Sequence, residues 1–432
     1  MWTCLLSLAA IADQSNGAPE DFGADGVNDL DMDAYRKSPL EHVLLLDAVP
    51  SLLLLNEGSP SYRLRYPGSN RRVGDAYSLR LEGGLQARLE KLFASLSGSA
   101  GAIYSGLDDS LDHSEKLLEA YAKFVPNASL SLAAGKRNVK WGKGYVYNPV
   151  SLAGRQRDVN DIEASLEGYW MLSAEAIKSF PRPLETLAAT LALIPVVKDM
   201  NQGYAEDETL SLASQLYFLL WDTDLDVYGA WNTGGRVSAG FDVSRNLLSN
   251  LEAHAELAYH SEIGRQVFQN DSTAVPSEGS GAEILAGTRY LAPFNTTFIF
   301  EFLHRTEGYT AGEMEAYRSA LEGAAGRPIQ DPLRRKVAGL SRFYSGQFLM
   351  RNYFYAKASH PDFLNVLYFN PALYALVNAE DGSVMGGVEM SYVRFAHLSL
   401  LLRIAAFAGD GDTEYGMKPV RQRTEFRMRA ML

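Results

Sequence analysis

The chain has 432 residues, a formal net charge of −12 and a single cysteine, Cys4. This acidic balance argues against a nucleic-acid partner, because phosphate binding requires an extended basic surface. One cysteine excludes disulfides within the chain and cysteine-based metal clusters. No shift in composition divides the middle of the chain, so a single large unit is expected.

The first residues predict export. Residues 2–12 are nearly all apolar or small, and Ala10-Ile11-Ala12 before Asp13 has the form of a signal-peptidase site. Residues 1–12 are therefore predicted to be a signal peptide, truncated at its start because no Lys or Arg precedes the apolar stretch. Residues 13–60 are predicted to be a periplasmic leader, since residues 13–40 are acidic and rich in turn-forming residues.

Apolar runs in the chain are too short for a membrane helix, which needs about 18 to 20 consecutive apolar residues. The best candidates are residues 43–55 and 187–197, and the first is interrupted by Asp47 and Pro50. An exported protein of this kind is periplasmic, secreted or an outer-membrane barrel. Periodicity distinguishes these classes.

Apolar and polar residues alternate in repeated segments from about residue 76 onward. Clear examples are residues 209–220, 224–232, 251–260, 384–392, 398–406 and 421–432. A period of two indicates a β-strand, and about ten residues is the length that a tilted strand needs to cross a bilayer. Side chains predicted to face lipid include Leu398, Leu400, Leu402, Phe426 and Met428.

Residues 61–432 are therefore predicted to form an all-β, transmembrane, antiparallel up-and-down barrel of about 16 strands, within a range of about 14 to 18. A soluble sandwich is the alternative, but its strands are commonly shorter. Two stretches, residues 136–164 and 306–338, break the alternation. Both are predicted to be long loops, either extracellular or folded into the lumen, and the second includes a short amphipathic helix between Gly312 and Gly323.

One region resembles porin-like outer-membrane barrels of Gram-negative bacteria. The resemblance covers about thirty residues closely, in an order that recurs early in such barrels. The matching motifs are Leu118-Glu119-Ala120-Tyr121, Pro126-Asn127, Gly135-Lys136-Arg137, Trp141-Gly142-Lys143-Gly144 and Asn148-Pro149. It implies a barrel in the outer membrane of a Gram-negative bacterium, with lipid and the barrel assembly machinery as partners. It implies no catalytic or ligand-binding residues.

The strand pattern predicts which charged side chains face the lumen, where substitutions tune selectivity. A basic ladder and an acidic wall are expected to face each other and to create a transverse field. The alternative is that these charges merely pair with one another. The predicted pore-lining residues are Arg421, Arg423, Arg427, Arg429, Arg403, Arg351, Asp224, Asp226, Glu252 and Glu256.

The first long loop is predicted to narrow the pore if it folds inward. This placement is favoured because the aromatic side chains of Trp141, Tyr145 and Tyr147 require a less solvent-exposed site. The candidate constriction residues are Lys136, Arg137, Lys140, Trp141, Lys143, Arg155 and Arg157.

These features predict a porin-like channel for passive passage of small polar or charged solutes, with no enzymatic activity and no cofactor. One alternative is a sheath that holds an exported partner, such as a multihaem cytochrome, in its lumen. A less favoured one is an outer-membrane hydrolase that pairs His254 or His260 with Asp224 or Asp226. No metal site is predicted, because residues two apart on a strand lie almost 7 Å apart, about twice the separation that ligands of one ion prefer.

Overall fold

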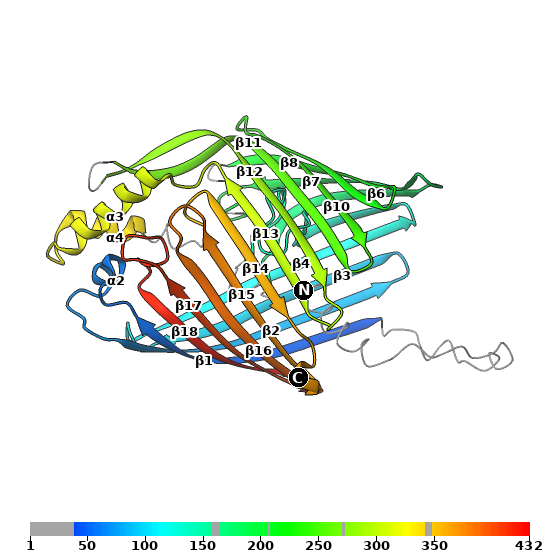
Figure 1. Ribbon diagram of the computed structural model, residues 1–432. Helices are drawn as coiled ribbons and strands as arrows, with labels where there is room; N and C mark the ends of the chain where they lie inside the picture. The colour runs from blue at the N-terminus through cyan, green and yellow to red at the C-terminus, as the bar shows by residue number, and fades with distance from the viewer. Residues whose placement is uncertain (1–38, 158–164, 202, 206–207, 270–272, 342–347) are drawn as a thin grey trace.

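The computed structural model describes residues 39–157, 165–201, 203–205, 208–269, 273–341 and 348–432 (Figure 1). The predicted signal peptide and most of the predicted leader lie outside the described residues. The described chain forms one closed antiparallel sheet of 18 strands. Each strand pairs with the next along the chain, and β18 pairs with β1 to close the ring. The predicted all-β barrel is confirmed, with a strand number at the upper limit of the expected range.

The strands are β1 (Leu40–Leu55), β2 (Val73–Leu89), β3 (Leu92–Ser105), β4 (Ser110–Asn127), β5 (Leu130–Arg137), β6 (Tyr169–Ser179), β7 (Leu184–Val196), β8 (Thr209–Leu220), β9 (Thr223–Asn232), β10 (Val237–Leu248), β11 (Leu251–Gln269), β12 (Thr273–Leu291), β13 (Thr297–Arg305), β14 (Asn352–Ser359), β15 (Phe369–Asn378), β16 (Val384–Phe395), β17 (Leu398–Ala408) and β18 (Val420–Met431). The helices are α2 (Pro60–Arg65), α3 (Ala311–Ala325), α4 (Pro332–Ser341) and the short 3-10 helix η3 (Phe363–Asn365). Helix α3 is the helix predicted between Gly312 and Gly323.

The barrel begins at Leu40, so the predicted boundary at residue 61 is wrong. Strand β1 pairs with β2 along its length and with β18 on its other side. Its inner face carries apolar residues such as Leu45 and Leu55, which are 5% and 6% exposed, so the segment lacks the alternation that marks the other strands. Pro50 is accommodated where the β1–β18 ladder is interrupted, because proline has no N–H to donate.

The two faces of the wall differ as the alternation predicts. Phe426 and Met428 keep exposed fractions of 39% and 38% on the outer face, and Leu398 keeps 36%. Large apolar side chains on other strands are exposed in the same way, among them Leu79, Leu85, Leu212, Val227, Leu257, Phe300 and Leu373. Charged residues such as Glu82 and Asp226 point inward and are buried. An apolar exterior around a polar interior suits a wall between lipid and water.

The two ends of the barrel differ in the length of their connections. At one end most strands are joined by short turns, such as Glu90-Lys91 between β2 and β3. At the other end lie most of the long connections and the three α-helices, on the left in Figure 1. Short turns are periplasmic and long loops extracellular in outer-membrane barrels, which orients the molecule. Among the described residues, no helix has the length and apolar character required to cross a membrane.

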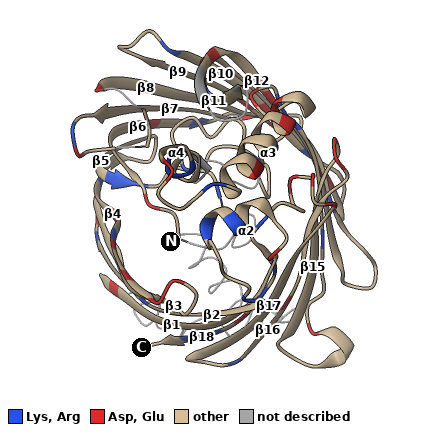
Figure 2. Ribbon diagram, turned by 90° about the vertical axis from the view of Figure 1, so that its left-hand side faces the viewer, with Lys and Arg blue, Asp and Glu red and all other residues tan. Residues whose placement is uncertain are grey.

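The three α-helices gather at the extracellular mouth, within the outline of the ring (Figure 2). Thr310 caps α3 in a capping box with Glu313, which fixes where the helix begins. The guanidinium group of Arg334 in α4 donates to backbone carbonyls of Ala325 in α3 and Arg63 in α2, at 2.8 and 2.7 Å. One buried side chain therefore ties the three helices together.

Candidate functional site

The connection between β5 and β6 folds into the barrel. Within residues 138–157, the side chains of Trp141, Val146 and Val150 are 3%, 1% and 0% exposed. Trp141 and Val150 pack against inner-face residues of β6–β9 and β11, and Val146 belongs to a cluster that includes the helical cap. The described part of the loop thus lies inside the lumen. Lys136 and Arg137 do not belong to it, because they form the end of β5.

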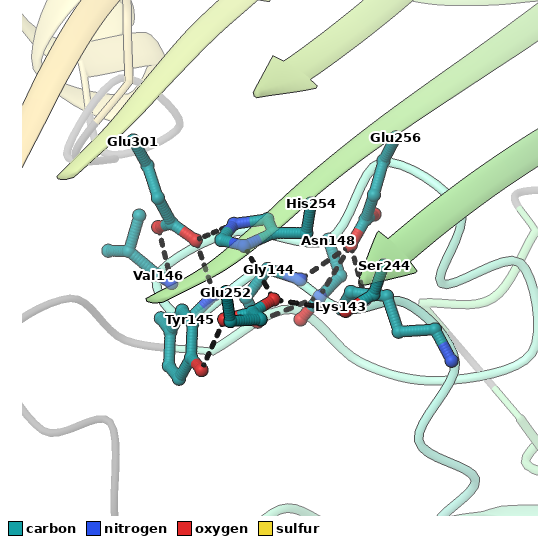
Figure 3. Close-up of polar contacts among 10 residues, drawn as sticks. All are labelled: Lys143, Gly144, Tyr145, Val146, Asn148, Ser244, Glu252, His254, Glu256 and Glu301. Atoms are coloured by element: carbon teal, nitrogen blue, oxygen red, sulfur yellow. Dashed lines mark hydrogen bonds and ion pairs between the residues drawn. The ribbon is translucent and has the colours of Figure 1, made fainter. Parts of the chain in front are cut away.

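The side chain of Glu256 holds one turn of this loop (Figure 3). Its Oε1 atom accepts hydrogen bonds from the backbone N–H groups of Lys143 and Gly144, at 2.5 and 2.6 Å. The same oxygen accepts from Nδ2 of Asn148 at 3.1 Å, and Oε2 accepts from the N–H of Val150 at 3.4 Å. Glu256 is only 2% exposed, so these donors replace the water that a carboxylate requires.

A second carboxylate, that of Glu301 on β13, holds the next two residues of the loop. It accepts from the N–H of Tyr145 at 2.6 Å and from that of Val146 at 3.0 Å. His254 bridges the wall, with Nε2 lying 3.1 Å from Glu301 and Nδ1 lying 3.1 Å from Glu252. The Tyr145 hydroxyl donates to Glu252 at 3.0 Å. Burial, reinforced by the charge of Glu252, raises the pKa of Tyr145 to about 12, so this hydroxyl remains a donor.

Glycine is required where the loop approaches Glu256. Gly142 has a φ of +98°, and a Cβ atom at this position would lie 2.8 Å from Oε1 of Glu256. Any other residue would combine backbone strain with a clash against the carboxylate. Gly142 is therefore the key residue of the Trp-Gly-Lys-Gly motif, because it lets the following backbone N–H groups converge on the carboxylate of Glu256.

The predicted acidic wall lies beside the loop. Asp226 and Asp242 face each other directly across β9 and β10, and both are 0% exposed. The Nζ atom of Lys143 lies 3.0 Å from Asp226, and the hydroxyl of Tyr228 donates to Asp242 at 2.7 Å. Burial alone would lower the pKa of Lys143, but Asp242 and Asp226 raise it above its usual value. Asp224, which was also predicted to line the pore, accepts from the Tyr217 hydroxyl at 2.5 Å.

The predicted basic ladder lies on the inner face of β17 and β18 but is partly neutralised. Arg429 pairs with Asp47 of β1 through contacts of 2.7 and 2.9 Å. Arg403 pairs with Glu389 at 2.8 Å and lies 3.5 Å from Glu425. These pairs agree with the alternative in which the lumen charges pair with one another, because each of these two guanidinium groups contacts a carboxylate on a neighbouring strand.

The extracellular part of the ladder is more accessible. The side chain of Arg423 is 52% exposed although its Nη2 atom lies 2.6 Å from Glu425. Arg421 is also exposed, and its Nε atom donates to Asn56 at 3.3 Å. Arg427 shares their face of β18. Arg351 does not belong to this set, because it precedes β14 and donates to the carbonyl of Gly308 among the extracellular connections.

Two cavities adjoin the loop, one on each side. The extracellular cavity has a volume of about 1180 Å³, and the periplasmic one, which reaches the β2–β3 turn, has a volume of about 660 Å³. Ser151 and Arg155 line both. Among the described residues that line the periplasmic cavity, basic side chains outnumber acidic ones. The basic residues are Arg88, Lys91, Lys123, Arg137, Lys140, Arg155 and Arg157, and the acidic ones are Glu90 and Glu119.

The cations of the periplasmic cavity differ in how far they are neutralised. Arg155 donates from Nε to the carbonyl of Glu167 at 3.0 Å and lies over the ring of Tyr169. Lys136, nearby, pairs with the carboxylate of Glu167 at 2.5 Å. No carboxylate of the described residues forms an ion pair with Lys140 or Arg157. Burial lowers the pKa of Lys140, and the charges of Arg157 and Lys143 lower it further.

The histidine–aspartate pairs required by the hydrolase alternative are not formed among the described residues. His254 lies between Glu252 and Glu301, and His260 contacts the hydroxyl of Ser238 at 2.8 Å, so neither contacts Asp224 or Asp226. In the described part of the chain, no group of three or more His, Cys, Asp or Glu side chains is arranged to hold a metal ion.

Two residues important to this arrangement were missed by sequence reasoning. Glu301 is the only charged side chain within Phe298–Phe302, where Phe298, Phe300 and Phe302 alternate with inward positions. A lone carboxylate at an inward position of an apolar strand is the signal that could have identified it. Asp47 was assigned to the leader and therefore could not be recognised as a partner of Arg429.

No family model matches the chain, and no curated protein matches it in sequence. Solved structures do resemble it. A BenF-like porin from Pseudomonas fluorescens Pf-5 matches with a TM-score of 0.53 and 9% identity, over 91% of this chain and 98% of that one. Pseudomonas aeruginosa OccK2 (OpdF) in complex with glucuronate matches with a TM-score of 0.52 and 9% identity, over 91% and 98%. Pseudomonas aeruginosa OpdK with vanillate matches with a TM-score of 0.52 and 10% identity, over 91% and 98%. The barrel therefore has the fold of an outer-membrane porin.

Proposed function

We propose that the protein is an outer-membrane channel for passive diffusion of small polar solutes, with a preference for anions. The observation that carries this proposal is the cavity of about 660 Å³ on the periplasmic side of the loop, where basic side chains outnumber acidic ones among the described lining residues. A confined space lined by one sign of charge raises the local concentration of ions of the other sign. The volume lies in the range of sites that hold small molecules.

Solved structures of the same fold support the choice of solute class. Glucuronate and vanillate, bound in two of them, are small organic anions. In this chain Lys140 and Arg157 would meet such a solute beneath the loop, and the exposed Arg421 and Arg423 would meet it nearer the extracellular mouth.

The sheath alternative is less well supported. It requires a lumen that admits a folded partner, whereas the chain's own residues 138–157 lie inside this barrel and the helices gather at its mouth. The periplasmic cavity that adjoins the loop has the size of a small-molecule site.

Single-channel recording in planar bilayers tests the proposal. The wild-type protein is expected to conduct without a partner, and its reversal potential under a salt gradient should indicate preference for anions. Lys140→Gln with Arg157→Gln should shift that potential toward cation preference, because two cations leave the cavity. Arg335→Gln, on the exposed surface of α4, removes a charge outside the cavity and should shift the potential far less, because a charge open to solvent is screened by salt. A protein that stays closed in the bilayer, or that prefers cations, would contradict the proposal.

A further inference from the structure

The tip of the lumen loop is held by a small set of carboxylates on the barrel wall. Glu256 and Glu301, on β11 and β13, together accept five backbone N–H groups between Lys143 and Val150. Figure 3 shows both side chains pointing at this turn from the strands. Hydrogen bonds from backbone N–H groups to a buried carboxylate are about twice as strong as neutral ones. This contact therefore contributes strongly to the position of the loop.

The other ties of the tip lead to the same side of the barrel. Lys143 pairs with Asp226 on β9, and the Tyr147 hydroxyl donates to Glu283 on β12 at 2.9 Å. Val150 packs so closely on Gly240 of β10 that a Cβ atom at Gly240 would lie 2.9 Å from its Cγ1. The tip is thus fastened to the wall formed by β9–β13. On β18, Arg423 remains half-exposed.

We propose that Glu256 and Glu301 are positioning residues that hold the loop against the β9–β13 wall and so keep the conducting path open and steady. This inference rests on the proposed channel function. When a carboxylate is replaced by an amide of the same shape, an NH₂ group takes the place of one accepting oxygen and faces an N–H donor. The turn then loses acceptors in a buried place, and the loop is expected to leave the wall and enter the path intermittently.

Glu256→Gln and Glu301→Gln test this inference by two independent measurements. Backbone amides of residues 143–150 should exchange with deuterium faster, by about tenfold or more, since that is the factor lost with one charge-assisted hydrogen bond. Single-channel records should show brief closures, with the closed fraction of time raised by about tenfold or more. The matched control is Glu389→Gln, which removes a lumen carboxylate that pairs with Arg403 and Lys357 instead of with the loop. Heat-modifiable migration on gels verifies that each variant folds.

A disulfide lock distinguishes loop movement from a simple change of charge. A Cβ atom at Gly240 would lie 3.4 Å from Cβ of Val150, close to the separation found in disulfides. Val150→Cys with Gly240→Cys, in a Cys4→Ser and Glu256→Gln background, should give steady current when oxidised and closures when reduced.

The outcomes separate the two proposals. Unchanged amide exchange in both Gln variants would overturn the positioning role whether or not the protein conducts, and so would closures that persist in the oxidised lock. A wild-type protein that stays closed would instead count against the channel function, while faster exchange in the variants would still support the attachment of the loop.

Discussion

Replacing Asp47 by alanine is expected to weaken the seam at which the barrel closes. Asp47 on β1 lies directly opposite Arg429 of β18 and Arg80 of β2. Its carboxylate is 3% exposed and accepts from Arg429 at 2.7 and 2.9 Å and from Arg80 at 2.9 Å. The substitution would leave two guanidinium groups facing each other across the space that the carboxylate occupies.

The magnitude follows from how buried the partners are. Removing one member of a fully buried ion pair costs about 3 to 5 kcal/mol. Here the side chains of Arg429 and Arg80 keep 20% and 31% exposure, so water would solvate them in part. A loss of about 2 to 3 kcal/mol in the free energy of unfolding is therefore expected. Guanidinium-induced unfolding in detergent, followed by circular dichroism, measures it.

The control for Asp47→Ala is Glu57→Ala. Glu57 also pairs with an arginine, Arg72, at 3.2 Å, but the two side chains are 41% and 81% exposed. This loss should stay below about 1 kcal/mol, because exposed ion pairs contribute little. Equal losses from the two variants would refute the argument that burial at the seam determines the cost. The double variant Asp47→Ala with Arg429→Met should regain part of the loss, since it removes one of the two uncompensated charges.

Three further predictions concern the outer face, the lumen and the extracellular cap. Leu402 lies opposite Phe426 on the outer face, near the middle of β17. Leu402→Arg should therefore lower the free energy of unfolding by about 2 to 4 kcal/mol, as measured by an unfolding titration in lipid, because it places a charge near the bilayer midplane. Ser399→Arg, on the inner face, should cost far less, and equal costs would mean that the strand register is wrong. Arg421→Gln with Arg423→Gln should shift the reversal potential toward cations, an effect that shrinks at high salt, and an unchanged potential would place both residues outside the conducting path. Burial raises the pKa of Glu414, in the β17–β18 connection, from 4.5 to about 7. The protonated carboxyl of Glu414 therefore stabilises the folded state fully below its ordinary pKa of 4.5, and this contribution is lost as the pH rises through about 7. Protection factors of the backbone amides in residues 409–419, which compare each exchange rate with the intrinsic rate at the same pH, should therefore be lower above pH 7 than below it, and Glu414→Gln should abolish this difference.

The fold was predictable where one face of a strand is uniformly apolar and the other polar. Segments such as β8, β9 and β18 have that pattern, and their outer and inner faces lie where it indicates. Strand β1 was missed because the closing seam buries leucines on its inner face, beside Asp47, so its sequence resembles a short apolar run. Pattern alone cannot distinguish such a strand from a buried segment.

The candidate site was predictable in composition but not in its pairings. The sequence placed Asp226, Glu256 and Arg403 on inward positions, since a strand period of two determines which face a residue occupies. It could not indicate that Arg403 meets Glu389, because which strands adjoin, and in which register, depends on pairing between segments of the chain.

The class of protein therefore follows from local properties of the chain: alternation, segment length and the short apolar runs together require a closed barrel in a lipid bilayer. The path of the lumen loop depends instead on contacts between distant parts of the chain. Residues 143–150 are held by Glu256 and Glu301, which follow more than one hundred residues later in the chain. Closure of the ring brings those carboxylates to the loop, and the burial that closure creates gives the hydrogen bonds between them their strength.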